Sequence, residues 1–224
     1  MQRIPEPTLT RLTSLYRYLR LLQRGGKQNA SSAFLGNSMG VPAHTIRKDL
    51  TYIERPSQSG AGYNIEELAA AIAAALGMDI PRKACIVGLG RLGAAVLNYP
   101  ELADNTIQIC AGFDSDTNRL ELLQTDIPVY PSYQIPEIVR SAGIELAVIA
   151  VPPEAAQLTL QRLTVAGIQG IINFSPVYLE QNNSDIVIRN IFLIEELQVL
   201  SARICLKEAI KNNPENREKE RGRI

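Results

Sequence analysis

The sequence predicts an α/β protein in which a small, mainly helical domain precedes a parallel β-sheet covered by helices. Apolar residues recur at helical spacing up to residue 76, whereas from residue 84 short β-branched runs alternate with helical stretches. Such an alternation is typical of a parallel sheet with helices on both faces. A turn-rich segment at residues 77–81 separates the two patterns and indicates a linker.

The first part contains four expected helices with local start and stop signals. Thr8 can cap the first helix and a glycine pair ends it, Ser31 or Ser32 caps the second, and Pro42 opens the third. Residues 56–62 are rich in Ser, Gly and Pro and predict a loop or a hairpin tip. The expected helices cover residues 8–24, 32–39, 42–52 and 65–76.

Residues 32–50 fit a helix-turn-helix. Gly40 can adopt the left-handed backbone of the turn, and apolar residues on either side allow two short helices to pack at a steep angle. The outward positions of the second helix, the expected recognition helix, carry Ala43, His44, Arg47 and Lys48. Arg can contact guanine in the major groove and Lys can contact phosphate or guanine, so these four residues are expected to contact DNA. The alternative is a helical hairpin with two surface cations.

The charge distribution supports nucleic-acid binding by the first part. The chain has 23 basic and 23 acidic residues and no net charge. Residues 1–60 hold nine Lys and Arg against three Asp and Glu, a balance of 9 − 3 = +6, so the remainder carries 14 − 20 = −6. A basic first quarter on a neutral chain is typical of a small nucleic-acid-binding module fused to a second domain. A solvated helix face is the alternative.

The second part is expected to be a parallel-sheet domain of the Rossmann type, followed by a C-terminal helix. Its expected strands cover residues 84–88, 107–114, 146–151, 170–174 and 186–191. Its expected helices cover residues 91–99, 136–142, 154–166 and 194–211. Residues 212–224 are almost all polar and are expected to be disordered.

A glycine motif lies between the first expected strand and the helix that follows it. Gly88 permits the tight turn, Gly90 lets the backbone approach a pyrophosphate, and Gly93 lets the helix pack closely on the sheet. The amides at the start of the helix can then bind phosphate. With residues at the ends of two further strands, the motif forms the expected cofactor-binding set: Gly88, Leu89, Gly90, Arg91, Leu92, Gly93, Asp114, Ser115, Val151 and Pro152.

Asp114, at the end of the second expected strand, indicates which cofactor binds. A carboxylate there can accept hydrogen bonds from the adenosine ribose hydroxyls and would repel a 2′-phosphate, which favours NAD over NADP. Arg91 argues in the other direction, towards NADP, because a cation there could contact a phosphate. Val151 and Pro152 follow another strand and are expected to wall the nicotinamide side. The alternative is a structural glycine turn.

Binding without catalysis is the simpler interpretation of the second part. A dehydrogenase needs a group that moves a proton, often His, Lys or Tyr, and the only histidine, His44, lies in the expected recognition helix. Tyr99, Tyr130 and Tyr133 are better explained as core or pocket aromatics. The sequence offers no Ser-His-Asp set and no cluster of metal ligands there. Two alternatives stay open: a small NAD-dependent oxidoreductase, and a DNA-binding protein with a ligand-free Rossmann-like dimerisation domain.

The cysteines and the hydropathy pattern bear on location. Cys85, Cys110 and Cys205 are far apart and odd in number, so no disulfide framework is expected. The sequence shows no basic-then-apolar leader and no apolar run long enough to span a bilayer. We therefore expect a soluble, cytoplasmic protein that does not enter membranes.

Several stretches follow one another in an order that is found in a known family: Tyr18-Leu19-Arg20, Arg47-Lys48-Asp49-Leu50, Gly60-Ala61-Gly62-Tyr63-Asn64, the glycine motif, Phe113-Asp114-Ser115-Asp116, Asn173-Phe174-Ser175-Pro176-Val177 and Glu196-Leu197-Gln198-Val199-Leu200. On these stretches the sequence resembles the Rex family of redox-sensing repressors, over roughly residues 4–206. The resemblance implies binding of double-stranded operator DNA in the free or NAD+ form and release of DNA when NADH binds. It also implies Ser31 and Tyr63 as DNA contacts.

The resemblance further implies a homodimer with a defined domain plan. Each subunit is expected to have a winged-helix DNA-binding domain over residues 1–78 and a Rossmann NAD(H)-binding domain over 79–192. A C-terminal helix over 193–211 is expected to be swapped between subunits, and the polar tail over 212–224 follows it.

Two regions depart from the family pattern. The wing usually carries a Lys-Arg pair before the glycine that matches Gly60, and here those positions are Gln58 and Ser59. Each lost phosphate contact should weaken DNA binding and flatten its salt dependence. The family also has an Asp where this chain has Phe192, and the resemblance implies that this Asp pairs with an Arg at the position of Arg20. Because Phe cannot accept that hydrogen bond, we expect this contribution to the NADH-dependent release of DNA to be absent or altered.

Overall fold

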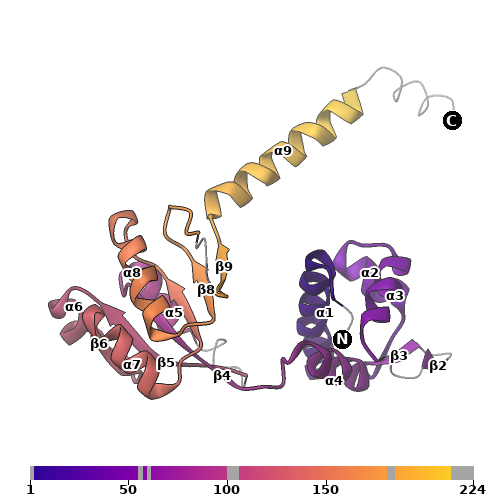
Figure 1. Ribbon diagram of the computed structural model, residues 1–224. Coiled ribbons are helices and arrows are strands. Elements are labelled where there is room, and N and C mark those ends of the chain that lie inside the picture. Colours follow the sequence, from indigo (N-terminus) through magenta and orange to yellow (C-terminus); the bar gives the residue numbers. More distant parts are fainter. Residues whose placement is uncertain (1–2, 55–57, 60–61, 100–105, 181–184, 213–224) are drawn as a thin grey trace. The chain divides into compact units, whose positions relative to one another are not determined.

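The computed structural model describes residues 3–54, 58–59, 62–99, 106–180 and 185–212. The chain forms two compact units, Met1–Pro81 and Arg82–Ile224 (Figure 1). The division falls at the end of the turn-rich segment 77–81. It therefore separates the helical part of the sequence from the part in which strands and helices alternate.

The first unit is a helix-turn-helix completed by a small antiparallel sheet. Its helices are α1 (Glu6–Arg24), α2 (Ser32–Met39), α3 (Ala43–Asp49) and α4 (Ile65–Leu76), and the 3₁₀ helix η1 (Leu50–Tyr52) continues α3. Its strands are β1 (Asn29–Ala30), β2 (Gln58–Ser59) and β3 (Gly62–Asn64), in the order β1-β3-β2. The antiparallel pairing of β2 with β3 confirms a hairpin within residues 56–62, of which 56–57 and 60–61 lie outside the described residues.

Local capping sets the limits of α2, and a longer-range contact corrects one expectation for α1. The Ser31 hydroxyl accepts a hydrogen bond from a backbone amide of the first turn of α2, and Gly40 ends α2 with a left-handed φ of 69°. The expected cap by Thr8 is wrong. Helix α1 already begins at Glu6, and the Thr8 hydroxyl instead donates to Asp49 at 3.0 Å. Thr8 therefore joins α1 to α3.

One apolar core holds the first unit together. Leu12, Leu15 and Leu19 repeat at helical spacing along α1, and all three are buried. The other elements contribute further buried side chains: Leu35, Ile46, Leu50, Tyr63, Ile65, Leu68 and Ile72. Burial of each large apolar side chain stabilises the unit by roughly 1.5–3 kcal/mol.

The second unit is a parallel sheet with helical crossovers, which confirms the predicted fold class. The strands are β4 (Arg82–Val87), β5 (Ile107–Asp114), β6 (Val129–Pro131), β7 (Leu146–Ile149), β8 (Gly170–Asn173) and β9 (Val187–Asn190). They pair in parallel in the order β6-β5-β4-β7-β8-β9. The helices are α5 (Arg91–Leu97), α6 (Thr117–Leu122), α7 (Ile135–Ala142), α8 (Pro153–Ala166) and α9 (Leu193–Asn212), and the 3₁₀ helix η3 (Ser132–Gln134) precedes α7.

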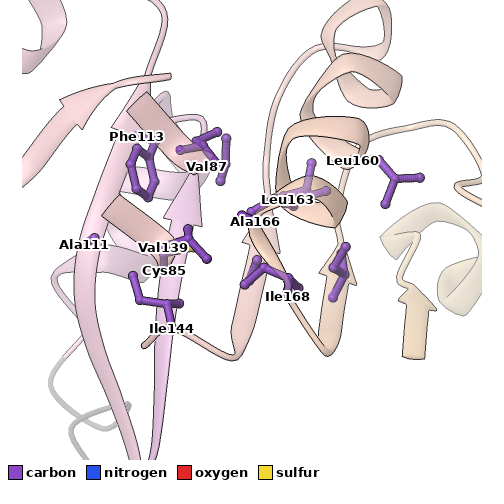
Figure 2. Packing of buried hydrophobic residues seen from close by; sticks show 14 of the residues in the cluster. Cys85, Val87, Ala111, Phe113, Val139, Ile144, Leu160, Leu163, Ala166 and Ile168 are labelled. Carbon is purple, nitrogen blue, oxygen red and sulfur yellow. The ribbon is translucent and has the colours of Figure 1, made fainter. Parts of the chain in front are cut away.

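Two apolar layers form the core of the second unit. The larger layer joins the strands to α7 and α8. Figure 2 shows side chains of this layer, among them Val87 and Phe113 from the strands and Val139 from α7. The smaller layer contains Ile86 and Leu97. Because Ile86 and Val87 are neighbours on β4, their side chains point to opposite faces of the sheet. Both faces of the sheet therefore carry apolar packing, as the alternating pattern predicts.

Some elements differ from the prediction. The sequence pattern indicates neither α6 nor β6: α6 has no buried side chain, and β6 is a three-residue edge strand, so neither shows a clear apolar repeat. The last expected strand and helix are present as β9 and α9. Of the tail expected to be disordered over residues 212–224, Asn212 instead ends α9, and residues 213–224 lie outside the described residues. Over the described ranges, no helix has the length and apolar character needed to cross a membrane.

Candidate functional site

Helix α3 presents a basic outer face. His44, Arg47 and Lys48 are exposed, Ala43 is half-buried, and Asp49 on the inner side is buried. Because residues three and four positions apart share one face of a helix, His44, Arg47 and Lys48 can meet a ligand together. The helix therefore presents to solvent the cations that a recognition helix needs.

Besides the contact of Thr8 with Asp49, two further side-chain interactions hold α3 within the described part of the first unit. Arg11 of α1 forms a two-point ion pair with the buried Asp49, with Nε–Oδ2 at 2.6 Å and Nη2–Oδ1 at 2.7 Å. The hydrogen bond to Asp49 raises the pKa of Arg11. On the outer side, Arg47 donates from Nη1 to the Ser32 hydroxyl at 2.9 Å. The Arg47 guanidinium therefore starts from a defined position beside α2.

The two DNA contacts that the family resemblance added differ in position. Ser31 is exposed while its hydroxyl caps α2. Tyr63 is only 2% exposed, and it packs in the core of the first unit opposite Ala30 of β1. The ring belongs to the core in this conformation, and the expected contact between Tyr63 and DNA stays a prediction. Gln58 and Ser59 form β2, where Gln58 pairs with Tyr63.

The glycine loop at residues 88–93 joins β4 to α5. Gly88 has a φ of 91°, and a Cβ there would lie 2.6 Å from the carbonyl oxygen of Ala150. A Cβ on Gly93 would overlap the carbonyl oxygen of Gly88, so both positions need glycine for the fold itself. Gly90 differs, because a Cβ there would meet no heavy atom within 4 Å. The fold thus leaves open the space at Gly90, where this motif brings the backbone close to a pyrophosphate.

Three adjacent strand ends bring the expected cofactor residues to one edge of the sheet. β4 lies between β5 and β7, and all three run parallel, so the glycine loop, Asp114 and Val151 follow neighbouring carboxyl ends. The backbone N–H of Gly88 donates to the carbonyl of Phe113 at 2.7 Å, which ties the loop to β5. Ligands of open parallel sheets bind at this edge.

The other residues of the expected cofactor set differ in their exposure to solvent. Leu89 is buried in the smaller apolar layer. The Val151 side chain is half-buried, and its carbonyl accepts a hydrogen bond from the Ser175 hydroxyl at 2.8 Å. The exposed members of the expected set are Arg91, Leu92, Ser115 and Pro152.

Asp114 is 4% exposed at the end of β5. Its Oδ2 accepts hydrogen bonds from the Leu89 amide at 2.6 Å and from Nη1 of Arg119 at 2.9 Å, and its Oδ1 accepts from the Asp116 amide at 2.9 Å. Burial opposes ionisation of Asp114, but these hydrogen bonds and the positive charge of Arg119 outweigh burial and lower the pKa of Asp114. Asp114 is therefore an ionised acceptor held in a fixed position.

Sequence reasoning missed Arg119 and gave Ser175 no role. The Asp116 carboxylate caps the start of α6, and this cap is the signal that could have placed Arg119 in a helical turn next to Asp114. Ser175 is 1% exposed, and its amide donates to Asn173 Oδ1 at 2.9 Å. The Asn173–Ser175 contact, with the bond to Val151, fixes the turn after β8 against the end of β7.

Two family models match the chain, one in each unit. The family described as "Putative DNA-binding protein N-terminus" matches residues 3–51, and the family described as "CoA binding domain" matches residues 79–177. The first match covers the helix-turn-helix, and the second covers the glycine loop and Asp114.

Curated relatives and solved structures extend the similarity to almost the whole chain. The redox-sensing transcriptional repressor Rex of Listeria welshimeri is 36% identical over 198 residues, 88% of this chain and 92% of the relative. Rex of Desulforamulus reducens is 32% identical over 92% of this chain and 98% of the relative. The crystal structure of RSP, a Rex-family repressor, has a TM-score of 0.81 at 30% identity and covers 94% of this chain and 98% of RSP.

RSP has also been solved with ligands. Its complex with β-NADH gives a TM-score of 0.82, and its complex with β-NAD+ and operator DNA gives 0.83. The identity extends over nearly the full length of the curated relatives, and the two-domain fold is shared with RSP. This chain belongs to the Rex family of redox-sensing transcriptional repressors.

Proposed function

We propose that this chain is a transcriptional repressor that binds operator DNA and uses NAD(H) as a signal. In this proposal the free or NAD+-bound protein binds DNA, and NADH releases it. The observation that carries the proposal is that one chain joins an exposed basic recognition helix to a glycine loop beside the ionised Asp114. RSP, which covers 94% of this chain, has been solved with β-NAD+ and operator DNA.

The edge of the sheet that carries the glycine loop, here called the glycine edge, fits NAD(H) at three points. The open space at Gly90 can take the pyrophosphate, and the Asp114 carboxylate can accept a hydrogen bond from the adenosine ribose. Val151 and Pro152 would wall the nicotinamide side. The other proposed members of this edge are Gly88, Leu89, Arg91, Leu92, Gly93 and Ser115.

NAD(H) supplies a two-state signal, because its nicotinamide ring is neutral when reduced and cationic when oxidised. An apolar environment accepts the neutral ring more readily than the cation, for reasons of desolvation. NADH can shift the protein between two arrangements only if it binds one of them more tightly than the other. The proposed release of DNA therefore requires NADH to prefer the arrangement that does not bind DNA.

The proposed DNA-contacting surface consists of the outer face of α3 and the start of α2. Arg47 would read guanine, Lys48 would contact phosphate, and Ala43 and His44 would approach base edges or the backbone. Ser31 lies exposed at the start of α2. Tyr63 is also proposed as a DNA contact, although its ring is buried in this conformation and would have to become accessible in the complex.

We also propose a homodimer in which α9 is swapped between subunits. One stripe of α9 carries Leu193, Leu197, Leu200 and Ile204, which are between 53% and 76% exposed. The spacing of four, three and four residues puts these side chains on one helix face, and a stripe of this kind is normally covered by another element. A second copy of the chain is the covering partner that the Rex resemblance favours.

Catalysis is not part of the proposal. The chain has a single histidine, and it lies on α3 of the first unit, away from the glycine edge in sequence and in domain. NAD(H) would therefore be bound and released unchanged. Because a repressor acts on the DNA of the cell, we propose that the protein is located in the cytoplasm.

The experiment that tests the proposal measures DNA affinity of the full chain at fixed salt. An operator is first selected from random-sequence duplexes, and fluorescence anisotropy then gives Kd without ligand, with NAD+ and with NADH. We expect NADH to weaken binding by at least about tenfold relative to NAD+, which is about 1.4 kcal/mol. CoA, the ligand in the matching family's description, serves as a comparison nucleotide and is expected to have no effect.

Three outcomes would contradict the proposal in different ways. Failure to select any DNA sequence would remove the repressor role. Sequence-specific DNA binding without calorimetric heat for NAD+ or NADH would favour a ligand-free dimerisation domain. Steady-state oxidation of NADH with an added substrate would favour an oxidoreductase.

A further inference from the structure

The Asp114 carboxylate has little acceptor capacity left for a ligand. A carboxylate offers about four lone-pair sites. Within the described part of the chain, Oδ2 accepts two hydrogen bonds, from the Leu89 amide and from Arg119, and Oδ1 accepts one from the Asp116 amide. About one site therefore remains, whereas the 2′- and 3′-hydroxyls of a ribose would need two.

Arg119 is the one donor among these three that can leave. The other two donors are backbone amides fixed by the glycine loop and by the start of α6. The Arg119 side chain is 44% exposed, so solvent can replace its contact with Asp114. Its backbone is held in place, since the Arg119 amide donates to Oδ1 of Asp116, the cap of α6. The Arg119 backbone is therefore fixed, whereas its charged side chain can leave Asp114, the carboxylate proposed to bind the adenosine ribose.

The charge of Arg119 also weakens the repulsion between this site and a 2′-phosphate. An isolated carboxylate repels a 2′-phosphate, which is why Asp at this position favours NAD over NADP. Here the guanidinium lies 2.9 Å from Oδ2 of Asp114 and 3.7 Å from Oδ2 of Asp116. It therefore offsets part of the negative potential, and its planar set of N–H donors suits a phosphate.

We infer that Arg119 is the specificity-determining residue of the adenosine side and lowers the preference for a ribose diol over a 2′-phosphate. The inference rests on the proposed binding of NAD(H). Two effects act in the same direction. Arg119 competes with the ribose for Asp114, which weakens binding of the diol, and it attracts a 2′-phosphate, which strengthens binding of the phosphorylated form.

The test compares two probes that lack the nicotinamide ring, ADP-ribose and 2′-phospho-ADP-ribose, by isothermal titration of the full chain. The measured quantity is the ratio of the two Kd values. Arg119→Gln removes the charge and shortens the side chain while keeping a polar end, and we expect it to raise the preference for ADP-ribose about tenfold. Arg119→Lys keeps the charge and is expected to restore most of the wild-type ratio.

Two further variants control for the site and for the fold. Arg91→Gln lies by the glycine loop, where a cation would act on the pyrophosphate common to both probes, so it should change both affinities together and leave the ratio unchanged. Arg140→Gln on α7 tests the loss of an exposed cation elsewhere in the unit, and it should change neither affinity. Thermal unfolding of each variant confirms that it is folded.

The outcomes separate this inference from the proposed function. If wild type binds neither NADH nor ADP-ribose, the proposed function fails. If wild type binds both, a ratio that Arg119→Gln leaves within about threefold of wild type overturns the role of Arg119. A wild-type preference for ADP-ribose already above about a thousandfold overturns it as well, because Arg119 would then not offset the repulsion.

Discussion

Arg11 and Asp49 lie 38 positions apart in the sequence, yet they form the ion pair that fastens α3 to α1, with Nε 2.6 Å from Oδ2. The Asp49 carboxylate is buried and also accepts from Thr8, so the pair positions α3 without using any of its outward cations. Of the Arg47-Lys48-Asp49-Leu50 stretch, the first two residues face solvent and the last two face the core. The stretch therefore joins the exposed basic face of α3 to the residues that hold the helix in place.

Arg11→Ala should destabilise the first unit by about 2 kcal/mol. Its loss leaves the buried Asp49 carboxylate without its cation, which costs 3–5 kcal/mol for a fully buried pair, and the partial exposure of Arg11 reduces this. Urea denaturation followed by circular dichroism measures the change. Arg17→Ala removes an exposed cation from the same helix and should cost less than about 0.5 kcal/mol. Equal losses of unfolding free energy in the two variants would show that the Arg11–Asp49 ion pair does not stabilise the first unit.

Arg47→Ala and Lys48→Ala should weaken DNA binding in different ways. Removal of a guanine contact costs about 1–3 kcal/mol on the selected operator and relaxes its sequence preference. Removal of a phosphate contact lowers affinity for all sequences and reduces the slope of log K against log salt by about 1. Anisotropy titrations on operator and scrambled DNA at several salt concentrations distinguish the two. Unchanged operator affinity in Arg47→Ala would show that α3 is not the recognition helix.

Gly90→Ala and Gly93→Ala should separate binding from folding. An added methyl group at Gly90 meets no protein atom but fills the space proposed for the pyrophosphate, so the variant should keep its stability and bind NADH at least about tenfold more weakly. At Gly93 the methyl group overlaps the Gly88 carbonyl oxygen, so the variant should lose about 2–4 kcal/mol of stability. Normal NADH affinity in a folded Gly90→Ala variant would place the cofactor elsewhere.

The pKa of Asp114 gives a prediction about acid stability. Burial opposes ionisation, but hydrogen bonds from Asp116, Leu89 and Arg119 outweigh it and lower the folded-state pKa below the ordinary value of about 3.9. Such a group contributes stability that is fully present above its unfolded-state pKa and is lost as pH falls through its folded-state pKa.

The stability difference between wild type and Asp114→Asn should therefore be constant between about pH 7 and pH 5 and should shrink below about pH 4. Urea denaturation over this pH range measures it. Asp126→Asn, which alters an exposed carboxylate in the same unit, should show a small difference at every pH. A difference for Asp114→Asn that stays constant down to about pH 3 would contradict the assigned hydrogen bonds.

The sequence predicted most of what depends on neighbouring residues. Gly40 and Gly88 adopt the positive φ that their turns require, and Ser31 caps α2, because each of these features is decided within a few residues. The helix α4 and the strand β5 have the expected limits for the same reason, since their apolar repeats are long and clear.

Features that depend on distant partners were missed or misplaced. Thr8 has the chemistry of a helix cap, but a carboxylate 41 positions away takes its hydroxyl. The burial of Tyr63 was not foreseen either, because it depends on the pairing of β3 with β1; its expected contact with DNA stays a prediction. Arg119 carries no motif of its own, and its importance emerges only when α6 brings it to Asp114.

Phe192 gives the last prediction, which concerns the strength of the NADH response. Its ring packs edge-on against Tyr178, with centroids 4.8 Å apart, and the Tyr178 hydroxyl donates to Glu195 of α9 at 2.6 Å. These contacts tie the first turn of α9 to the segment after β8. The family pattern instead has an Asp at this position, which the resemblance pairs with an Arg at the position of Arg20.

Phe192→Asp should therefore enlarge the difference between operator affinity with NAD+ and with NADH, by about tenfold if one charge-assisted hydrogen bond of roughly 1.5 kcal/mol is gained in one of the two states. Phe192→Leu removes the same ring contact with Tyr178 without adding an acceptor, so it should leave the difference near the wild-type value. Anisotropy titrations with each nucleotide measure both variants. If the two variants behave alike, the missing acceptor is not what limits the response, and the ring contact itself would be the relevant feature.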